Sequence, residues 1–206
     1  WKRQRRLMSQ AFTPKRIRAY AAAMATVTGE EVGWRDGETI NLHDEMSRVT
    51  MAVVARVLFG TGVEEREVEQ VRHAMEDISV YYANSPEVVA MLPMWVPTPT
   101  LRKMRAGVRD INKIVYRIIG ARRTQRAGGV SPEGTGESLV EGGDLLETLL
   151  DACDDEGVGM SDQQLRDEVI TLFLAGHETT ALALAHTLYL VSKHPEVSRR
   201  LKEEVD

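Results

Sequence analysis

The sequence is poor in cysteine and in aromatic residues. It contains one cysteine, Cys153, and aromatic residues make up only 5% of its 206 positions. A single cysteine excludes an internal disulfide framework and is typical of a reducing compartment, so we expect a cytoplasmic protein. The length is sufficient for one domain with a substantial hydrophobic core.

Long apolar runs and an excess of positive charge are also missing. No apolar segment reaches the ~20 residues that a membrane-spanning helix needs, and no signal peptide is recognisable. The formal net charge is −5, which argues against nucleic acid as a partner. Because the chain starts at Trp1 and stops at Asp206 inside helical patterns, we expect residues 1–206 to be a single-domain fragment truncated at both ends. A membrane anchor outside these residues therefore remains an alternative.

Helical patterns cover nearly the whole chain and predict an all-α protein. One exception is the Asp36-Gly37 turn signal, which is followed by a short alternating stretch that predicts a β segment near residues 38–42. The prolines between residues 85 and 100 and the glycines between residues 127 and 143 predict loops. The expected helices are 1–12, 14–31, 43–59, 64–84, 101–126, 144–153, 161–193 and 196–206.

The helix expected at 161–193 is the best defined. Ser161 and Gln164 form an S-x-x-Q capping box, and His194-Pro195 ends the helix. The resulting ~32 residues span ~48 Å at 1.5 Å per residue, which is enough to cross a whole domain.

The centre of this helix contains Gly176, His177, Glu178, Thr179 and Thr180 between apolar flanks. Glycine and threonine are poor helix formers, and a buried glutamate is costly. A zinc site of the H-E-x-x-H type is excluded, because residue 181 is alanine. Two explanations remain: tolerated helix packing with threonine hydroxyls bonded to the preceding turn, or a helix weakened where a flat ligand approaches at Gly176 beside the Thr179 hydroxyl.

The segment Ala175-Gly176-His177-Glu178-Thr179-Thr180 resembles the A-G-x-[DE]-T-[TS] motif of the cytochrome P450 haem-thiolate monooxygenases. Trp1-Lys2-Arg3-Gln4-Arg5-Arg6 resembles the W-x-x-x-R helix of the same family, and Lys193-His194-Pro195-Glu196 resembles the turn that follows its long helix. The resemblance covers essentially the whole chain, and it implies a partial cytochrome P450 fold. The residues at the motif positions are similar to those of soluble microbial members.

The resemblance implies the following roles. Trp1 and Arg5 would bind a haem propionate, which agrees with their donor chemistry. Thr179 would position the activated oxygen, and Glu178 would relay protons to it. The residues expected to line the haem side of the helix are Ala175, Gly176 and Thr180.

The implied cofactor is haem b, and the implied reaction is the hydroxylation of a hydrophobic substrate by O2. The axial cysteine and the E-x-x-R helix are expected downstream, because Cys153 has no glycine-rich ligand loop and three acidic neighbours disfavour its thiolate. This chain would therefore contain no metal ligand, and the fragment alone is expected to be inactive. The implied electron donor is a ferredoxin, a flavin reductase or a fused reductase, with the basic residues between Lys2 and Arg18 as its docking face.

Substrate contacts are expected from Leu172, Phe173 and the oily segment at residues 88–96, with ordinary core packing as the alternative. The basic stripe between Arg102 and Arg117 indicates a solvated face, with a membrane-surface contact as the alternative. The alternative function for the whole chain is a non-catalytic all-α ligand-binding or interaction domain.

Overall fold

The computed structural model describes residues 1–60, 65–84, 98–128, 140 and 142–205. The chain begins with α1 (Lys2–Ser9), the short 3-10 helix η1 (Gln10–Phe12) and α2 (Pro14–Glu31). It continues with α3 (Leu42–Phe59), α4 (Glu65–Asn84) and α6 (Pro99–Ala127). It ends with α7 (Leu145–Asp151), α8 (Asp162–Lys193) and α9 (Pro195–Val205). The described part consists of helices and their connections and contains no strand, so the predicted all-α class is confirmed.

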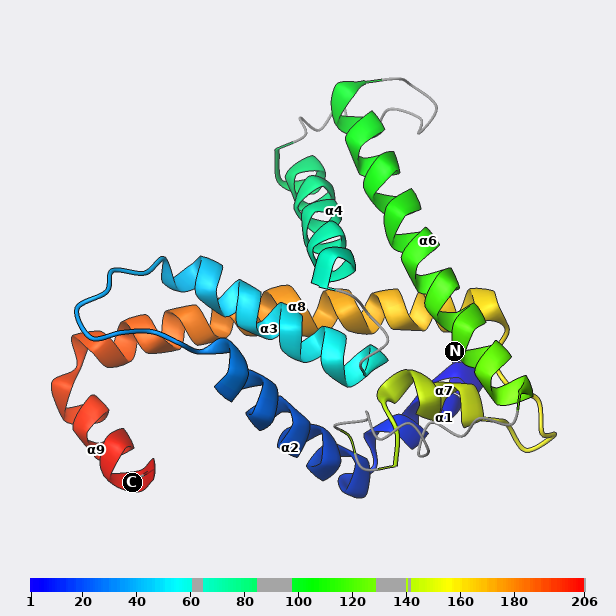
Figure 1. Cartoon of the computed structure of the whole chain (residues 1–206), viewed down its shortest axis with the longest axis horizontal. Helices are drawn as coiled ribbons and strands as arrows, with labels where there is room; N and C mark the ends of the chain where they lie inside the picture. Colours follow the sequence, from blue (N-terminus) through cyan, green and yellow to red (C-terminus); the bar gives the residue numbers. More distant parts are fainter. Residues whose placement is uncertain (61–64, 85–97, 129–139, 141, 206) are drawn as a thin grey trace.

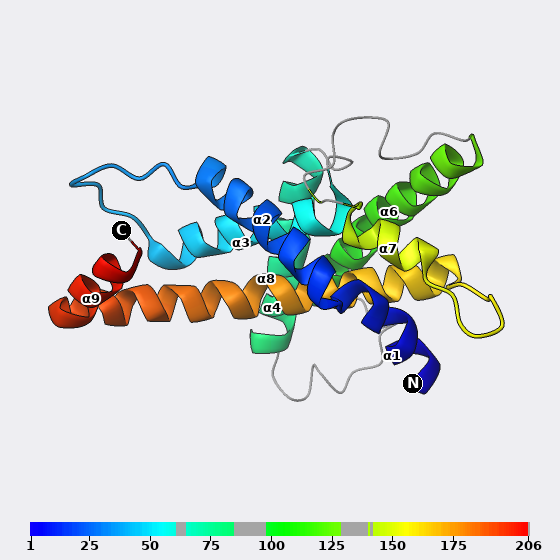
Figure 2. The ribbon, with the colours of Figure 1, turned by 90° about the horizontal axis from the view of Figure 1, so that it is seen from below.

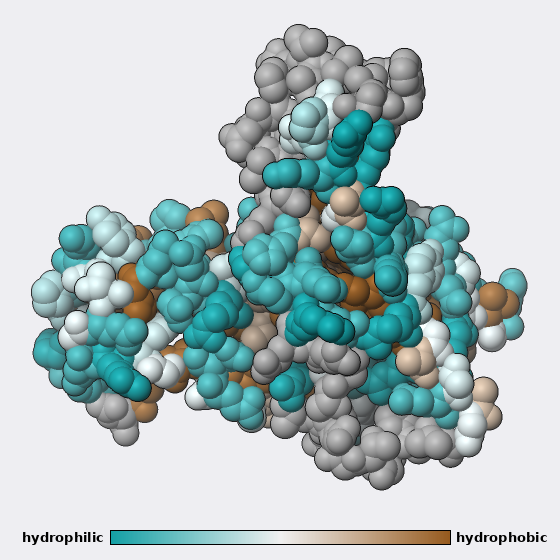
Figure 3. Space-filling view, turned by 45° about the horizontal axis from the view of Figure 1, so that its top comes forward, coloured by the Kyte–Doolittle hydropathy of each residue, from teal (hydrophilic) through white to brown (hydrophobic). Residues whose placement is uncertain are grey.

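The long helix α8 is the axis of the molecule. α3 runs antiparallel along it, and α4 and α6 form a pair that projects from its N-terminal half (Figure 1). The two termini lie at opposite ends of the molecule (Figures 1 and 2). The surface seen in Figure 3 is mostly hydrophilic, with hydrophobic side chains visible beneath the projecting pair.

The helix ends follow the predicted signals closely. Ser161 accepts a hydrogen bond from the Gln164 backbone, and the Gln164 side chain accepts one from the Ser161 backbone, so the capping box is confirmed. α2 begins after Thr13 with proline in its first turn, as the predicted range requires.

The β segment predicted near residues 38–42 is wrong. Residues 38–41 form no strand, and Leu42 already begins α3 with Asn41 as its N-cap. A strand needs a hydrogen-bonded neighbour. This segment is held by side chains instead: Trp34 Nε1 donates to Glu45 at 2.9 Å, and Glu38 accepts from the Arg35 backbone. The alternating pattern was therefore that of a connection lying against α3.

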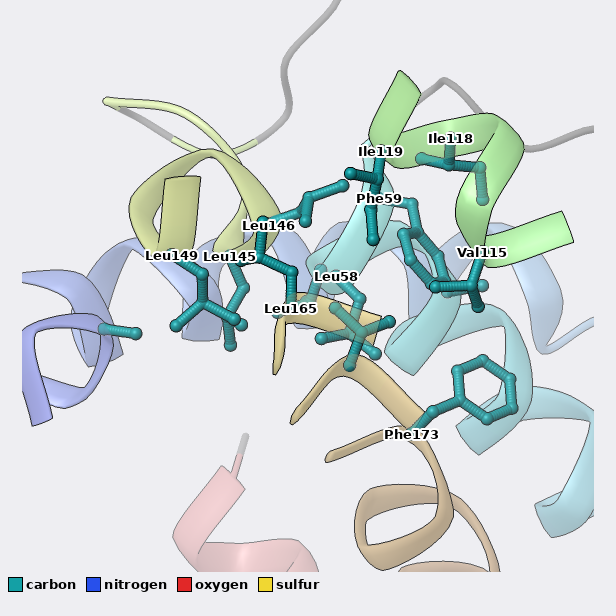
Figure 4. Close-up of a cluster of buried hydrophobic side chains, with 14 of the residues drawn as sticks. Leu58, Phe59, Val115, Ile118, Ile119, Leu145, Leu146, Leu149, Leu165 and Phe173 are labelled. Carbon is teal, nitrogen blue, oxygen red and sulfur yellow. The ribbon is translucent and has the colours of Figure 1, made fainter. Parts of the chain in front are cut away.

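The core lies where α3, α6, α7 and α8 meet. Its least exposed large side chains include Ile119, Leu146 and Leu165, and the rings of Phe59 and Phe173 lie 6.4 Å apart (Figure 4). Burying a side chain of this size stabilises the fold by about 1.5–3 kcal/mol. This packing fixes which side of α8 faces inward.

A buried ion pair joins the ends of α3, α6 and α7. The Arg122 guanidinium donates to Asp144 at 2.5 Å and to the Phe59 carbonyl at 3.0 Å, and Asp144 also caps α7 through the Glu147 backbone. Gly60 has a positive φ of 62°, and a Cβ there would lie 2.9 Å from the Asp144 carboxylate. Glycine at position 60 therefore makes room for the pair.

Candidate functional site

The inward side of α8 is a stripe of residues spaced by four. Its members are Leu165, Val169, Phe173, His177, Ala181 and Ala185, and all of them are buried. Each step of four residues adds about 40° beyond one turn. The stripe therefore winds slowly around α8 and follows α3 along it.

The opposite side of α8 is exposed at the predicted motif. Ala175, Glu178, Thr179 and Thr180 are all exposed. Ala175 and Thr179 each lie two residues, or about 200°, from the buried His177. We call the exposed side that contains Ala175 and Thr179 the open face of α8.

The hydroxyl of Thr179 is already oriented. It donates to the Ala175 carbonyl at 2.6 Å, and α8 continues without interruption through the motif. Threonine hydroxyls are known to bond to the preceding turn in this way. The predicted weakening of the helix is therefore not seen, and the Thr179 oxygen is left to act as an acceptor toward the open face.

Gly176 does not face the open side. A Cβ at this position would lie 3.2 Å from Val54 Cγ2 of α3, which is closer than most contacts of a Cβ. Its lack of a side chain is explained by close packing of α3 on α8, the alternative that the sequence left open. The expectation that Gly176 lets a flat ligand approach the backbone stays a prediction, with this packing as the other explanation for the glycine.

We expect Gly176→Leu to lower the free energy of unfolding by about 1–3 kcal/mol through overpacking against α3. Val54→Ala in the same chain should restore part of this loss, because it removes the atoms that the new side chain meets. Urea unfolding followed by circular dichroism measures both effects. Equal losses in the single and double variants would show that Gly176 does not pack against Val54.

The buried polar residue of the motif is His177, not Glu178. The imidazole is 9% exposed, and its Nε2 lies 3.0 Å from the Ser47 hydroxyl of α3. The sequence was interpreted as containing a buried glutamate. Residue types alone, however, do not show which of His177 and Glu178 points toward the core. The helical spacing of four from Phe173 to His177 and Ala181 was the signal that could have identified the histidine.

α1 presents two hydrogen-bond donors on adjacent turns. The Arg5 guanidinium lies 5.3 Å from the centre of the Trp1 ring, and both side chains are exposed. Within the described part of the chain, Arg5 has no carboxylate partner. A planar guanidinium with an indole N–H beside it suits a carboxylate ligand.

α1 lies on the open face of α8 (Figure 2). Gln4 of α1 donates to Glu168, which precedes Ala175 by seven residues and Thr179 by eleven, or nearly two and three whole turns. The three residues therefore point the same way, with Thr179 about 16 Å along the axis from Glu168. The structure thus brings the two predicted motifs to one side of the molecule.

Several basic residues near the N-terminus are used internally. Arg3 donates to Asp154 at 2.6 Å, Arg6 pairs with Asp155, and Arg16 donates to the Gly142 carbonyl. The Arg3 guanidinium and the backbone of the same loop hold the pKa of Asp154 below its ordinary value. The expected docking face for an electron donor is therefore smaller than the count of basic residues suggested.

The predicted substrate contacts differ in where they lie. Phe173 is 4% exposed and lines an entirely apolar cavity between α3, α4, α6 and α8, whereas Leu172 is half-buried against the same core. Phe173 therefore packs in the core beside this cavity, its role as a substrate contact stays a prediction, and residues 88–96 lie outside the described residues. Leu174 and Leu182, which are 42% and 47% exposed, lie near the open face. They were missed because a helical pattern alone does not distinguish an exposed leucine from a half-buried one such as Leu172.

The residues on this side suit a haem group. Ala175 offers a small side chain at the surface of α8, exposed leucines flank it, and Trp1 and Arg5 supply donors that match carboxylates. An apolar flat face with a cationic rim complements an apolar macrocycle with acidic substituents. Among the described residues, no group of histidine, cysteine or acidic side chains has the arrangement of a metal site, and no helix combines the length and apolarity of a membrane span.

The comparisons with known proteins agree with this geometry. The cytochrome P450 family model matches residues 1–206. The chain is 36% identical to cyclooctat-9-en-7-ol 5-monooxygenase of Streptomyces melanosporofaciens and 32% identical to pentalenene oxygenase of Streptomyces avermitilis, over 98% and 100% of its own length. It spans 42% and 43% of those two relatives, respectively.

A solved structure shows the same arrangement of helices. The haem domain of a cytochrome P450DA variant superimposes with a TM-score of 0.76 at 28% identity, and the match covers 100% of this chain and 42% of that one. Together with the family match over every residue, these findings show that the chain belongs to the cytochrome P450 family.

Proposed function

We propose that the whole protein is a haem-dependent monooxygenase that activates O2 and hydroxylates a hydrophobic organic compound. The balanced reaction converts R–H, O2, two electrons and two protons into R–OH and water. The observation that carries the proposal is the open face of α8, where Ala175 and Thr179 lie on the side that α1 contacts through Gln4 and Glu168, and α1 also carries the Trp1–Arg5 pair. Residues 1–206 would supply this distal face and the propionate-binding helix.

The roles of this chain's residues follow from their positions. Arg5 and Trp1 would bind the propionates and fix how the haem is oriented against α8. The small side chain of Ala175 would determine how closely the haem approaches α8, and Thr180 would border the same side of the helix. When bound, haem b supplies the redox-active iron, and we propose that its axial cysteine lies outside residues 1–206.

Thr179 and Glu178 would deliver protons to the activated oxygen. The Thr179 hydrogen is donated to the Ala175 carbonyl, so the hydroxyl oxygen would accept a hydrogen bond from a water molecule and hold it above the site. The exposed Glu178 would replace the proton that this water gives up, because its carboxylate can reach solvent.

We propose a terpenoid or a similar aliphatic compound as substrate. Two relatives with 36% and 32% identity are named for cyclooctat-9-en-7-ol and pentalenene. Two of the exposed side chains near the open face, Leu174 and Leu182, are aliphatic. The electron donor would be a separate ferredoxin or flavin reductase, or a fused reductase as the name of one relative, a self-sufficient cytochrome P450 monooxygenase from Aspergillus niger, indicates for that protein.

The test is the spectrum of the reduced full-length protein under carbon monoxide. A Soret band at the position of a thiolate-ligated haem is expected. Its absence would reject the monooxygenase and favour the second candidate, a non-catalytic helical binding domain, which binds its ligand without haem.

Arg5→Ala should weaken haem retention in the full-length protein. Losing a charge-assisted hydrogen bond costs about 1.5–3 kcal/mol, which corresponds to roughly tenfold or more in affinity. Haem transfer to apomyoglobin measures the rate of loss. Lys15→Ala is the control, because Lys15 lies in the same basic segment but on α2, and it should retain haem as the parent does. Equal haem loss for the Arg5 and Lys15 variants would contradict a propionate contact.

A further inference from the structure

α3 and α8 are joined by contacts that differ in how strictly they fix position. Met46 packs against Ala181 and Ala185 at one end of the seam, and Phe59 meets Phe173 at the other. Apolar contacts of this kind are not directional and tolerate small shifts. They determine which side of α8 faces α3, but they still allow small rotations of α8 about its own axis.

The Ser47–His177 hydrogen bond adds a directional contact next to the Met46 end of this seam. His177 is the polar member of an otherwise apolar stripe on α8, and burying its imidazole is costly unless it is hydrogen-bonded. The 3.0 Å distance between Nε2 and the Ser47 hydroxyl meets the geometry of a hydrogen bond. Breaking this bond would leave the imidazole without its Ser47 partner, so the contact is favoured. An alanine or leucine at position 177 would not require it.

The part-buried Ser47–His177 bond and the open face are linked through one turn of α8. His177 lies between Ala175 and Thr179 in the sequence, about 200° from each. Any rotation of α8 that breaks the Ser47 contact therefore moves the Thr179 hydroxyl sideways on the opposite face. Groups that take part in catalysis need to be held within about 0.5 Å and 10–20° of their productive geometry.

We propose that Ser47 and His177 are positioning residues, which fix the rotation of α8 so that Thr179 and Glu178 face the reacting oxygen. This inference rests on the proposed monooxygenase function. It assigns no contact with substrate or haem to either residue. Their effect is on how well protons are delivered, and hence on how much of the consumed reductant yields hydroxylated product.

The test uses three variants of the haem-loaded full-length protein. Ser47→Ala removes the hydroxyl, Ser47→Thr keeps it, and the double variant Ser47→Ala with His177→Leu removes both polar partners. Replacing both partners of a buried hydrogen bond by apolar groups is nearly neutral for stability. Thr50→Val is the matched control on α3, because the Thr50 hydroxyl is buried but bonds within its own helix to the Met46 carbonyl at 2.7 Å.

We expect Ser47→Ala to lower product formed per reductant by about fivefold, the equivalent of one hydrogen bond of about 1 kcal/mol. Ser47→Thr should retain the coupling of the parent, and so should Thr50→Val. The double variant should regain the unfolding midpoint but not the coupling. If the double variant regains both, the pair has only a structural role and the proposal is overturned.

A second readout is independent of turnover. Crystal structures of the parent and of Ser47→Ala should show the Thr179 hydroxyl displaced relative to α3 by about 0.5 Å or more. An unchanged position would overturn the positioning role even in a protein that lacks the carbon monoxide spectrum. Conversely, a protein with that spectrum and with unchanged coupling in Ser47→Ala would reject the positioning role while leaving the monooxygenase intact.

Discussion

Thr179→Ala in the full-length protein is expected to uncouple electron consumption from product formation. The reductant should be consumed at a similar rate, while most of the reduced oxygen leaves as peroxide. The reason is that the variant loses the hydroxyl oxygen that faces the open side of α8 and would hold the proton-delivering water. A neutral hydrogen bond of this kind is worth about 0.5–1.5 kcal/mol, so the ratio of product to peroxide should fall by roughly two- to tenfold.

The long helix offers a matched control for this experiment. Thr187 makes the same bond as Thr179, from its hydroxyl to the Ala183 carbonyl at 2.7 Å, and it is also exposed. Thr187→Ala removes an equal hydroxyl from the same helix two turns further along, and its coupling should match the parent. Thr179→Ser should retain most of the coupling, because serine can bond to the preceding turn in the same way.

Two outcomes would separate the possible roles of Thr179. Unchanged coupling in Thr179→Ala would show that its hydroxyl does not position the oxygen. Equal losses in the Thr179 and Thr187 variants would indicate a general effect on helix stability. Measurements of product, peroxide and consumed reductant in the same reaction distinguish these outcomes.

The helices themselves could be predicted well from the sequence. Caps and breakers act locally, so Ser161 with Gln164 fixed the start of α8 and His194-Pro195 fixed its end. The alternating segment at residues 38–42 was misleading for the opposite reason. A strand depends on a partner that the local pattern cannot reveal, and here the neighbouring element is α3 with Glu45 as an acceptor.

The candidate site could be predicted only in part from the sequence. Residue types identified the motif, but they did not show which way each residue points, and three of the assignments depended on direction. Gly176 faces Val54, Phe173 faces the core, and Glu178 is exposed while His177 is buried. Direction is set by the stripe that packs against α3, so it could be obtained only after the partner helix was placed.

Arg122→Met is expected to cause a large loss of stability in the folded protein. Arg122 and Asp144 are 15% and 3% exposed at their side chains, and removing the cation leaves a buried carboxylate without its nearest partner. Breaking a buried pair in this way costs about 3–5 kcal/mol. The urea midpoint at neutral pH should therefore drop clearly.

Asp144 also predicts how this loss varies with pH. Burial raises the pKa of the Asp144 carboxyl above its ordinary value, and the attraction of Arg122 only partly opposes this effect. A carboxyl with a raised pKa in the folded state contributes stability below its unfolded pKa of about 3.9, and that contribution is lost as the pH rises through the folded pKa. Arg122→Met removes the opposing attraction, so the pKa should rise further and the loss of stability with increasing pH should become larger.

Three comparisons make this prediction decisive. Asp144→Asn keeps a residue type that caps α7 but cannot ionise, so in the Arg122→Met background it should remove the added pH dependence and recover much of the stability. Arg199→Ala, which breaks the exposed pair with Glu203, should leave the midpoint nearly unchanged.

If Arg122→Met were equally stable at about pH 4.5 and pH 7.5, the Asp144 carboxylate would have no desolvation cost in the folded state. The junction of α3, α6 and α7 would then depend on the bond from Arg122 to the Phe59 carbonyl and not on charge.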